Sequence, residues 1–303
     1  MASVNTNTLT KRRKKIGWGQ IGLNTFFIIL SVFYIVPIVM LISTSLEGSV
    51  TTVFSIIPKE FSIAAYQLLL PNMKNLIRAM GVTLFYSITG VALSLLVMLL
   101  MSYSLSRRYF KLRGSLTFLL FFTTLFNGGL IGSYIVNASL LHLNDSIWIY
   151  ILPTVVNAWN VIVIRTYLQG LPEDMLEAAR IDGASEFQIC FRIVAPLSKP
   201  VLASVGFLRF IDAWNNWWTC QIYIRKPELY SIQYMLQRLI DSIDNLEQMI
   251  LTGMAGDGAA AALENLEAMR YATAVIAVLP VLFVFPFFQK YFAKGMTLGS
   301  VKG

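Results

Sequence analysis

The side chains that most often carry chemistry are few in this sequence and lie far apart. Its 303 residues include one histidine, His142, and two cysteines, Cys190 and Cys220, and the acidic residues form no catalytic cluster. A histidine-based triad, an HExxH metal site and a four-thiolate zinc site all require residues that the chain lacks. A GxxxxGK(S/T) phosphate loop is also missing, so the chain is not expected to hydrolyse ATP. The sequence therefore predicts no catalytic residue, no metal site and no enzymatic activity.

Amide, hydroxyl and tyrosine side chains recur at helical spacing in three otherwise apolar stretches. On helical wheels, each set falls on one face of its helix. Amides hydrogen-bond to hydroxyl groups and aromatic faces stack on sugar rings, so the three stripes suit a path for a saccharide. The candidate path residues are Asn127, Tyr134, Asn157, Asn160, Asn216, Trp217, Thr219 and Tyr223. An alternative is that these side chains only hold helices together.

One ionisable pair lies on the stripe that contains Asn216, Thr219 and Tyr223. Arg209 and Asp212 are three residues apart, a spacing at which the two side chains can neutralise each other. We therefore expect a structural ion pair rather than a substrate site. The same wheel places Trp214 and Trp218 on the opposite side, facing away from any cavity. The membrane stretches contain no surplus of basic residues, which favours neutral over acidic saccharides.

The composition indicates which elements position these residues. Hydrophobic residues make up 56% of the chain and charged residues 13%, about half the share usual in soluble proteins. A membrane-spanning helix needs about 20 mainly apolar residues. Six stretches qualify: 21–43, 80–104, 116–138, 147–166, 201–222 and 271–291. The sequence predicts an all-α polytopic membrane protein with six transmembrane helices.

The distribution of lysine and arginine predicts the orientation. With the N-terminus inside, the inner segments hold 16 basic residues and the outer loops hold six. This asymmetry follows the positive-inside rule and makes both termini cytoplasmic. The net charge of +8 is then a topology signal, and nucleic-acid binding is not expected. Residues 1–20 form a basic tail before one transmembrane domain, 21–303, whose core is about 75–295. An acidic outer loop, 223–269, forms either a folded docking surface or a flexible lid.

The cytoplasmic loop 171–200 predicts two short helices. Pro172 suits the first position of a helix, and Gly183 can take the left-handed conformation that ends it. Ser185 and Gln188 form a capping box for the second helix, which Pro196 is expected to close. On physical grounds alone, this loop could equally be an ordinary amphipathic connector.

Several motifs resemble one known family. Glu177-Ala178-Ala179, then Gly183, Ile193 and Pro196, resemble the EAA loop of ABC-importer permeases, although Ala195 replaces a frequent leucine. The tail 292–303 resembles the terminal signature of carbohydrate-importer permeases. Three further segments resemble the branch that takes oligosaccharides and polysaccharide fragments: 126–130, 157–160 and 214–217. The resemblance extends from about residue 20 to the end of the chain.

This resemblance implies a type I ABC importer fold in a bacterial plasma membrane. Such an importer has two permease subunits, commonly non-identical, two cytosolic ATPases that bind ATP and magnesium, and an extracytoplasmic sugar-binding protein. The substrate would be an oligosaccharide, and lipid would surround the spans. The EAA loop would dock into the ATPase through Glu177, Ala178, Ala179, Asp182, Gly183 and Ala184.

A different class of transporter is the main alternative. An ion-coupled secondary transporter would move sugars or other small polar solutes without an ATPase. Such proteins often carry ionisable residues through their spans and contain inverted repeats. This sequence shows no spread of acids or histidines in its spans and no inverted repeat. Co-purification with a soluble ATPase would distinguish the two.

Overall fold

The computed structural model describes residues 18–47 and 56–298. Most of the expected basic tail and the end of the C-terminal signature lie outside the described residues. Within the described part the chain is helical, and a single antiparallel bridge pairs Glu47 with Phe61. The all-α prediction is therefore confirmed for these residues.

Three helices are long and apolar enough to cross a membrane: α1 (Trp18–Ser45), α3 (Met73–Ser106) and α13 (Ala259–Leu298). They contain the first, second and sixth expected spans. A short helix, α2 (Ala64–Leu69), precedes α3. Helix α13 begins well before the expected 271–291, because the alanine-rich segment at its start favours helix and extends it into the expected outer loop.

The third and fourth expected spans are interrupted where the sequence places helix breakers. The third consists of α4 (Arg113–Leu125) and α5 (Gly129–Tyr134), with a π-helical turn following α5. Gly129 lies between them with a φ of +71°, which glycine adopts without strain. The fourth consists of two 3₁₀ turns within 147–154, the second containing Pro153, and then α6 (Ala158–Gln169), bent by 48°.

The fifth span differs from its prediction. The expected continuous helix 201–222 is wrong, because α10 (Lys199–Trp214) ends before α11 (Trp218–Tyr223) begins. At the break, the side-chain oxygen of Asn216 accepts a hydrogen bond from the backbone N–H of Thr219 at 3.0 Å. Asparagine competes with the helix for backbone groups in this way. Counting each bent pair as one span, the described residues contain up to five candidate spans.

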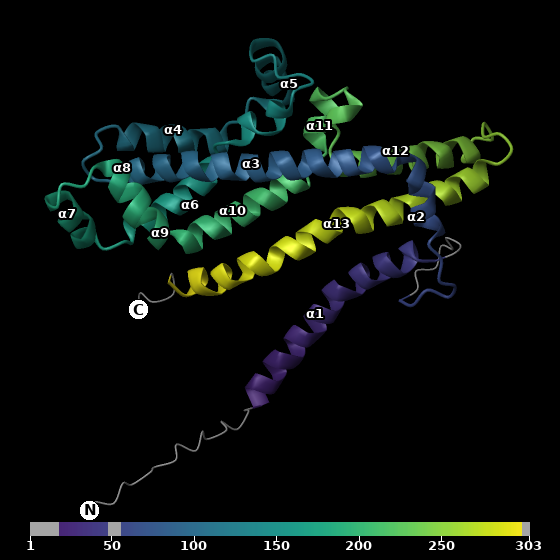
Figure 1. Cartoon of the computed structure of the whole chain (residues 1–303), viewed down its shortest axis with the longest axis horizontal. Helices are drawn as coiled ribbons and strands as arrows, with labels where there is room; N and C mark the ends of the chain where they lie inside the picture. Colours follow the sequence, from purple (N-terminus) through teal and green to yellow (C-terminus); the bar gives the residue numbers. More distant parts are fainter. Residues whose placement is uncertain (1–17, 48–55, 299–303) are drawn as a thin grey trace, which may run out of the picture.

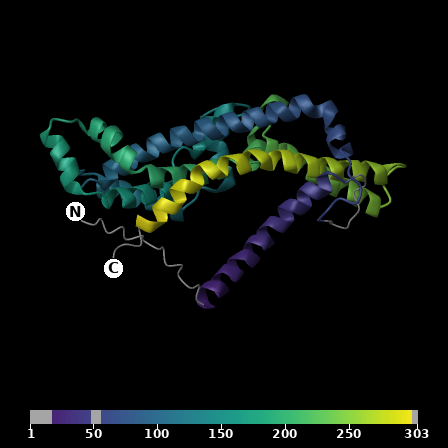
Figure 2. The ribbon, with the colours of Figure 1, turned by 60° about the horizontal axis from the view of Figure 1, so that its bottom comes forward.

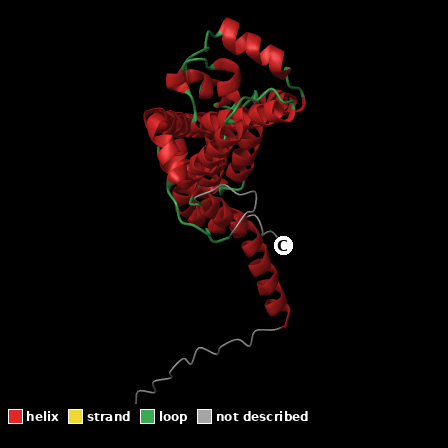
Figure 3. Ribbon diagram, turned by 90° about the vertical axis from the view of Figure 1, so that its right-hand side faces the viewer, coloured by secondary structure: helices red, strands yellow, loops and turns green. Residues whose placement is uncertain are grey.

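The helices form an elongated bundle (Figure 1). Helix α3 packs against α6 and α10, and α13 packs against α10 and α12 (Ile232–Leu251). Helix α7 (Glu173–Ile181) lies at one end of the bundle and α12 at the other. Helix α1 leaves the bundle at an angle, as Figures 2 and 3 show. Its side chains are exposed along most of its length, so lipid or another subunit must cover this apolar surface.

Three buried apolar clusters hold the bundle together. One joins α3, α6 and α10 to the loop 171–200 and includes Ile164, Leu176 and Ile189. A second surrounds the stacked rings of Tyr86 and Tyr150, whose centroids are 4.3 Å apart. The third joins α2, α3, α10, α12 and α13. The first cluster fixes the position of the loop that carries the EAA motif.

Candidate functional site

Helix α7 carries the EAA motif at the end of the bundle. Leu176 is fully buried in the first cluster and anchors the helix. Glu177 and Ala178 are exposed, and Ile181 is 81% exposed. Glu173 and Asp174 make the first turn of α7 acidic, and the exposed Ile181 is its last residue.

The turn after α7 confirms the predicted helix–turn–helix. Gly183 has a φ of +79°, and the N–H of Ala184 donates to the carbonyl oxygen of Ala179 at 3.0 Å. This hydrogen bond closes the helix end in the way that a left-handed glycine allows. Ser185 and Gln188 form the predicted capping box of α8 (Glu186–Ile189), with both hydrogen bonds present.

The expected end of the second helix at Pro196 needs correction. The helical segment runs from α8 through a π-helical turn, Cys190–Val194, into α9 (Ala195–Leu197). Pro196 lies inside this segment, directly after the π-helical turn, and the helix continues to Leu197. The bend occurs at Ser198 instead, where the chain turns by 80° into α10.

A polar network braces this turn, and sequence reasoning missed it. The Nε of Arg180 donates to a carboxylate oxygen of Glu186 at 2.9 Å, and its Nη2 donates to the Tyr109 hydroxyl at 3.1 Å. Tyr103, near the end of α3, donates to the other carboxylate oxygen of Glu186. The opposite charges of Arg180 and Glu186, on either side of the predicted turn, are the sequence signal that could have indicated this ion pair.

The electrostatics of this network favour its charged form. The hydrogen bond to the Glu186 carboxylate raises the pKa of Arg180 above its usual value. Burial and the nearby carboxylate also raise the pKa of Tyr109, which stays protonated and able to donate. The Arg180 guanidinium also lies 5.0 Å from the centre of the Tyr109 ring. Cation, carboxylate and ring together tie α7 and α8 to the end of α3.

A second site, which we call the central pocket, has a volume of about 410 Å³. It lies between the α4–α5 break, the 3₁₀ turns and α11, so the third, fourth and fifth expected spans all contribute to it. Tyr134 stacks on Tyr223 with ring centroids 5.6 Å apart, and the Asn137 amide donates to the Tyr223 hydroxyl at 3.3 Å. Its polar and aromatic lining includes Asn127, Ser133, Asn137, Thr154, Trp218, Thr219 and Tyr223.

The other predicted path residues do not line this pocket. The Asn157 side chain caps α6 by accepting the N–H of Asn160 at 3.0 Å, and Asn160 is only 8% exposed. The Asn216 amide donates to the Thr219 hydroxyl at 2.9 Å, across the helix break. Trp217 packs edge to face on Trp218. The hydrogen bonds of Asn157 and Asn216 are local, to residues three positions away, and do not join two helices.

The two tryptophans at the helix break have different environments. Trp214 is fully buried, and its indole N–H donates to the carbonyl oxygen of Ala277 at 3.1 Å, as expected for a side chain facing away from a cavity. The predicted placement of Trp218 away from the stripe is wrong, because Trp218 lines the central pocket beside Thr219. A single helical wheel does not hold across the break at 215–217.

The Arg209–Asp212 pair forms with a nitrogen–oxygen distance of 3.7 Å. The Asp212 side chain is 68% exposed, so solvent screens much of this attraction. Arg209 has a closer partner, since its Nη2 donates to the carbonyl oxygen of Thr154 at 2.5 Å. Arg209 thus links α10 to the wall of the central pocket.

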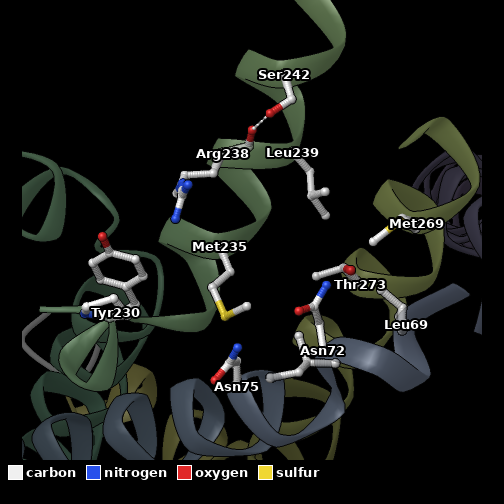
Figure 4. A pocket seen from close by; sticks show the side chains of 12 residues that line it. Leu69, Asn72, Asn75, Tyr230, Met235, Arg238, Leu239, Ser242, Met269 and Thr273 are labelled. Atoms are coloured by element: carbon white, nitrogen blue, oxygen red, sulfur yellow. Dashed lines mark hydrogen bonds between the residues drawn. The ribbon is translucent and has the colours of Figure 1, made fainter. Parts of the chain in front are cut away.

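A second pocket, of about 320 Å³, lies at the opposite end of the bundle from α7 (Figure 4). Asn72 and Asn75 from the start of α3 approach Met235 of α12 and Thr273 of α13 in this view. The Thr273 hydroxyl is buried without a hydrogen-bond partner. Helix α12 shows that much of the segment 223–269, expected as an outer loop, is folded, with a turn at 252–258 before α13.

Among the described residues, no group of three or more histidine, cysteine or acidic side chains could hold a metal ion. Both cysteines are buried with free thiols. The candidate site therefore consists of the exposed helix α7 at one end of the bundle and two pockets whose linings include polar side chains.

Comparisons with known proteins agree on one family. Protein LplC of Bacillus subtilis (strain 168) is 38% identical over 250 residues, covering 82% of each chain. The polygalacturonan/rhamnogalacturonan transport system permease protein YtcP of the same strain is 35% identical, covering 92% of this chain and 96% of its own. The arabinooligosaccharides transport system permease protein AraQ, also of that strain, is 31% identical over 94% and 96%.

A solved structure of a bacterial ABC transporter, one that imports the acidic polysaccharide alginate, contains a chain with the same fold. The TM-score is 0.76 at 28% identity, covering 90% of this chain and 95% of that one. Residues 82–298 match the family described as Binding-protein-dependent transport system inner membrane component. In this family the membrane component is not an enzyme, and separate subunits hydrolyse ATP. The chain is a multi-pass protein of the bacterial plasma membrane and belongs to the family of binding-protein-dependent ABC transporter permeases.

Proposed function

We propose that this chain is a permease subunit of an ATP-driven importer of oligosaccharides or polysaccharide fragments. It forms half of the translocation pore beside a second, non-identical permease. Two cytosolic ATPases, which hold ATP and magnesium, and an extracytoplasmic sugar-binding protein complete the assembly. The permease names of the relatives support the saccharide class.

The observation that carries this proposal is the exposed EAA helix on a braced turn. Helix α7 presents Glu177 and Ala178 to solvent at the end of the bundle, while Leu176 and the Arg180–Glu186 ion pair hold it in place. A rigid helix that protrudes from a membrane bundle suits the transmission of force from another subunit. We therefore assign ATPase coupling to Glu177, Ala178, Ala179, Asp182, Gly183 and Ala184.

The topology belongs to the same proposal. Six spans place α7 and both termini on the cytoplasmic side, and α12 outside. This topology requires the α4–α5 segment, which is interrupted before Gly129, to serve as the third of the six spans. Residues 223–269, which include α12, would present a folded surface to the binding protein, since this segment carries seven acids against three bases.

We propose that the central pocket is part of the saccharide path. Its amides, hydroxyl groups and tyrosine rings can bond and stack on sugars. Neutral and acidic saccharides are both candidates, because YtcP is named for polygalacturonan and the solved importer takes an acidic polysaccharide. These names weaken the expectation of a neutral saccharide, which rested on the lack of basic residues in the spans.

Co-purification and uptake test the proposal together. The full chain, tagged and expressed with its neighbouring transport genes, should retain a soluble ATPase, and ATP should drive uptake into vesicles of at least one oligosaccharide from a panel of neutral and acidic chains. An ion-coupled secondary transporter would instead need no ATPase, and a proton or sodium gradient alone would drive uptake. That second result would refute the importer assignment.

A further inference from the structure

Three arginines line a recess where apolar helices end. The ends of α3 and α6 and the start of α4 meet there, around a pocket of about 170 Å³. The pocket is lined by Arg107, Arg108 and Arg113, with Glu173 as its one acidic residue. Even if that carboxylate is counted, the recess has an excess of positive charge.

Protein groups leave this charge poorly satisfied. Arg107 is only 7% exposed, and its Nη2 is buried without a hydrogen-bond partner. Its Nε donates to the Ser106 hydroxyl at 3.0 Å, and its guanidinium lies over the Tyr103 ring. The two ion pairs found among the described residues involve neither Arg107 nor its arginine neighbours. Arg107 lines both this recess and a neighbouring pocket that contains Tyr103 and Glu186. Arg108 and Arg113 line the recess with no ion pair among the described residues, so the positive charge of the recess fits an anion.

An apolar groove lies beside the recess, on the same corner between α3 and α4. Its volume is about 350 Å³, and its lining includes Leu105, Phe110, Leu116 and Leu120. Leu116 stands one helical turn after Arg113 on α4, so adjacent turns of one helix contribute to the groove and to the recess. The corner therefore places an anion site next to a surface suited to a hydrocarbon chain.

We propose that this corner binds one acidic phospholipid, with its phosphate among Arg107, Arg108 and Arg113 and an acyl chain in the groove. Helix α3 is long enough to cross a bilayer and ends at the recess, which places the recess at headgroup depth. Phosphate oxygens accept charge-assisted bonds from guanidinium groups, and basic recesses between membrane helices suit anionic headgroups. A soluble subunit would supply an anion but no chain for the groove. Glu173 is the first residue of α7, so the lipid would lie against the docking helix.

The test measures lipid binding to the full chain, purified in detergent within its transporter complex. Native mass spectrometry is used to titrate dioleoyl phosphatidylglycerol, with dioleoyl phosphatidylcholine and inorganic phosphate as separate arms. We expect one phosphatidylglycerol per chain, bound at least tenfold more tightly than phosphatidylcholine. The double variant R108Q/R113Q spares the buried Arg107 and should weaken phosphatidylglycerol binding at least tenfold, since each charge-assisted contact contributes about a factor of ten.

A matched control removes the same charge elsewhere. Arg192 and Lys199 are exposed bases of the loop 171–200 that line neither the recess nor the groove, so R192Q/K199Q should change binding less than twofold. Equal binding of the two lipids, or equal weakening by both double variants, would overturn the proposal. Inorganic phosphate that competes fully with the lipid would show that the recess takes free phosphate instead. Loss of the ATPase from R108Q/R113Q with unchanged lipid binding would assign the recess to a protein partner and also refute the proposal.

Discussion

Gly183 offers a direct test of the role proposed for α7, because its conformation and its surroundings separate backbone strain from collision with the bundle. Its φ is +79°, in the left-handed region. A Cβ atom added at this position would meet nothing within 4 Å. A leucine there would therefore not collide with the bundle, and its effect would come from the backbone conformation and from its own bulk on the exposed turn.

The magnitude follows from the backbone. A non-glycine residue pays about 1–2 kcal/mol in the left-handed region, and asparagine tolerates it better than most. A penalty of that size changes a conformational equilibrium by a factor of about 5–30. Gly183→Leu should therefore shift the turn toward conformations in which α7 no longer points as it does here. Gly183→Asn should keep most of the native turn.

The assay compares the two variants for ATPase retention on an affinity column and for ATP-driven saccharide uptake, after normalising to the amount of chain in the membrane. Gly183→Leu should lose about five- to thirtyfold in both measurements, with unchanged membrane levels, because the turn lies outside the apolar spans. Gly183→Asn should stay within a few-fold of the parent chain. If leucine behaves like the parent, or if asparagine loses as much as leucine, the turn geometry does not control docking.

Three further predictions concern helix α7, the central pocket and the turn at Asp145. Glu177→Ala should weaken ATPase binding about ten- to hundredfold through loss of a charge-assisted contact, and normal pull-down and uptake would contradict this role. Trp218→Cys should react with a water-soluble maleimide, against a silent background from the buried Cys190 and Cys220, and failure to label would refute its exposure in the pocket. Asp145 accepts two backbone N–H groups that hold its carboxyl pKa below the usual value, so its contribution to stability is present above the unfolded pKa of about 4 and is lost as the pH falls through the folded pKa. Asp145→Asn should lower thermal stability more at pH 7 than at a pH low enough to protonate the folded parent carboxyl, and an equal loss at both would contradict this.

Rules that involve only neighbouring residues were enough to predict the turn between α7 and α8, although not where the second helix ends. The left-handed Gly183 and the Ser185 capping box depend on residues within a few positions of each other, and both form as expected. The contacts of Tyr103 with Glu186 and of Tyr109 with Arg180 depend on where the chain around the end of α3 lies, far away in the sequence. Such a contact is fixed by packing, so a single sequence does not reveal it.

The fifth span shows where periodicity fails. Residues 201–222 contain no proline or glycine at the break, so a helical wheel treats them as one helix. Two adjacent asparagines end the helix there instead, and the side chain of Asn216 bonds to backbone and hydroxyl groups of Thr219. The phase of every later residue then changes, which is why Trp218 lines the pocket beside Thr219.

The contacts of α10 suggest how motion of the docking helix would reach the saccharide path. Leu176 of α7 is buried among residues of α3, α6 and α10, and close-packed interiors transmit displacement rather than absorb it. The segment after α7 continues through the bend at Ser198 into α10. On α10, Arg209 holds the carbonyl of Thr154, and Thr154 lines the central pocket. A shift of α7 that moves α10 must therefore either break that hydrogen bond or move the pocket wall, so Arg209 matters for coupling more than its weak pairing with Asp212 indicates.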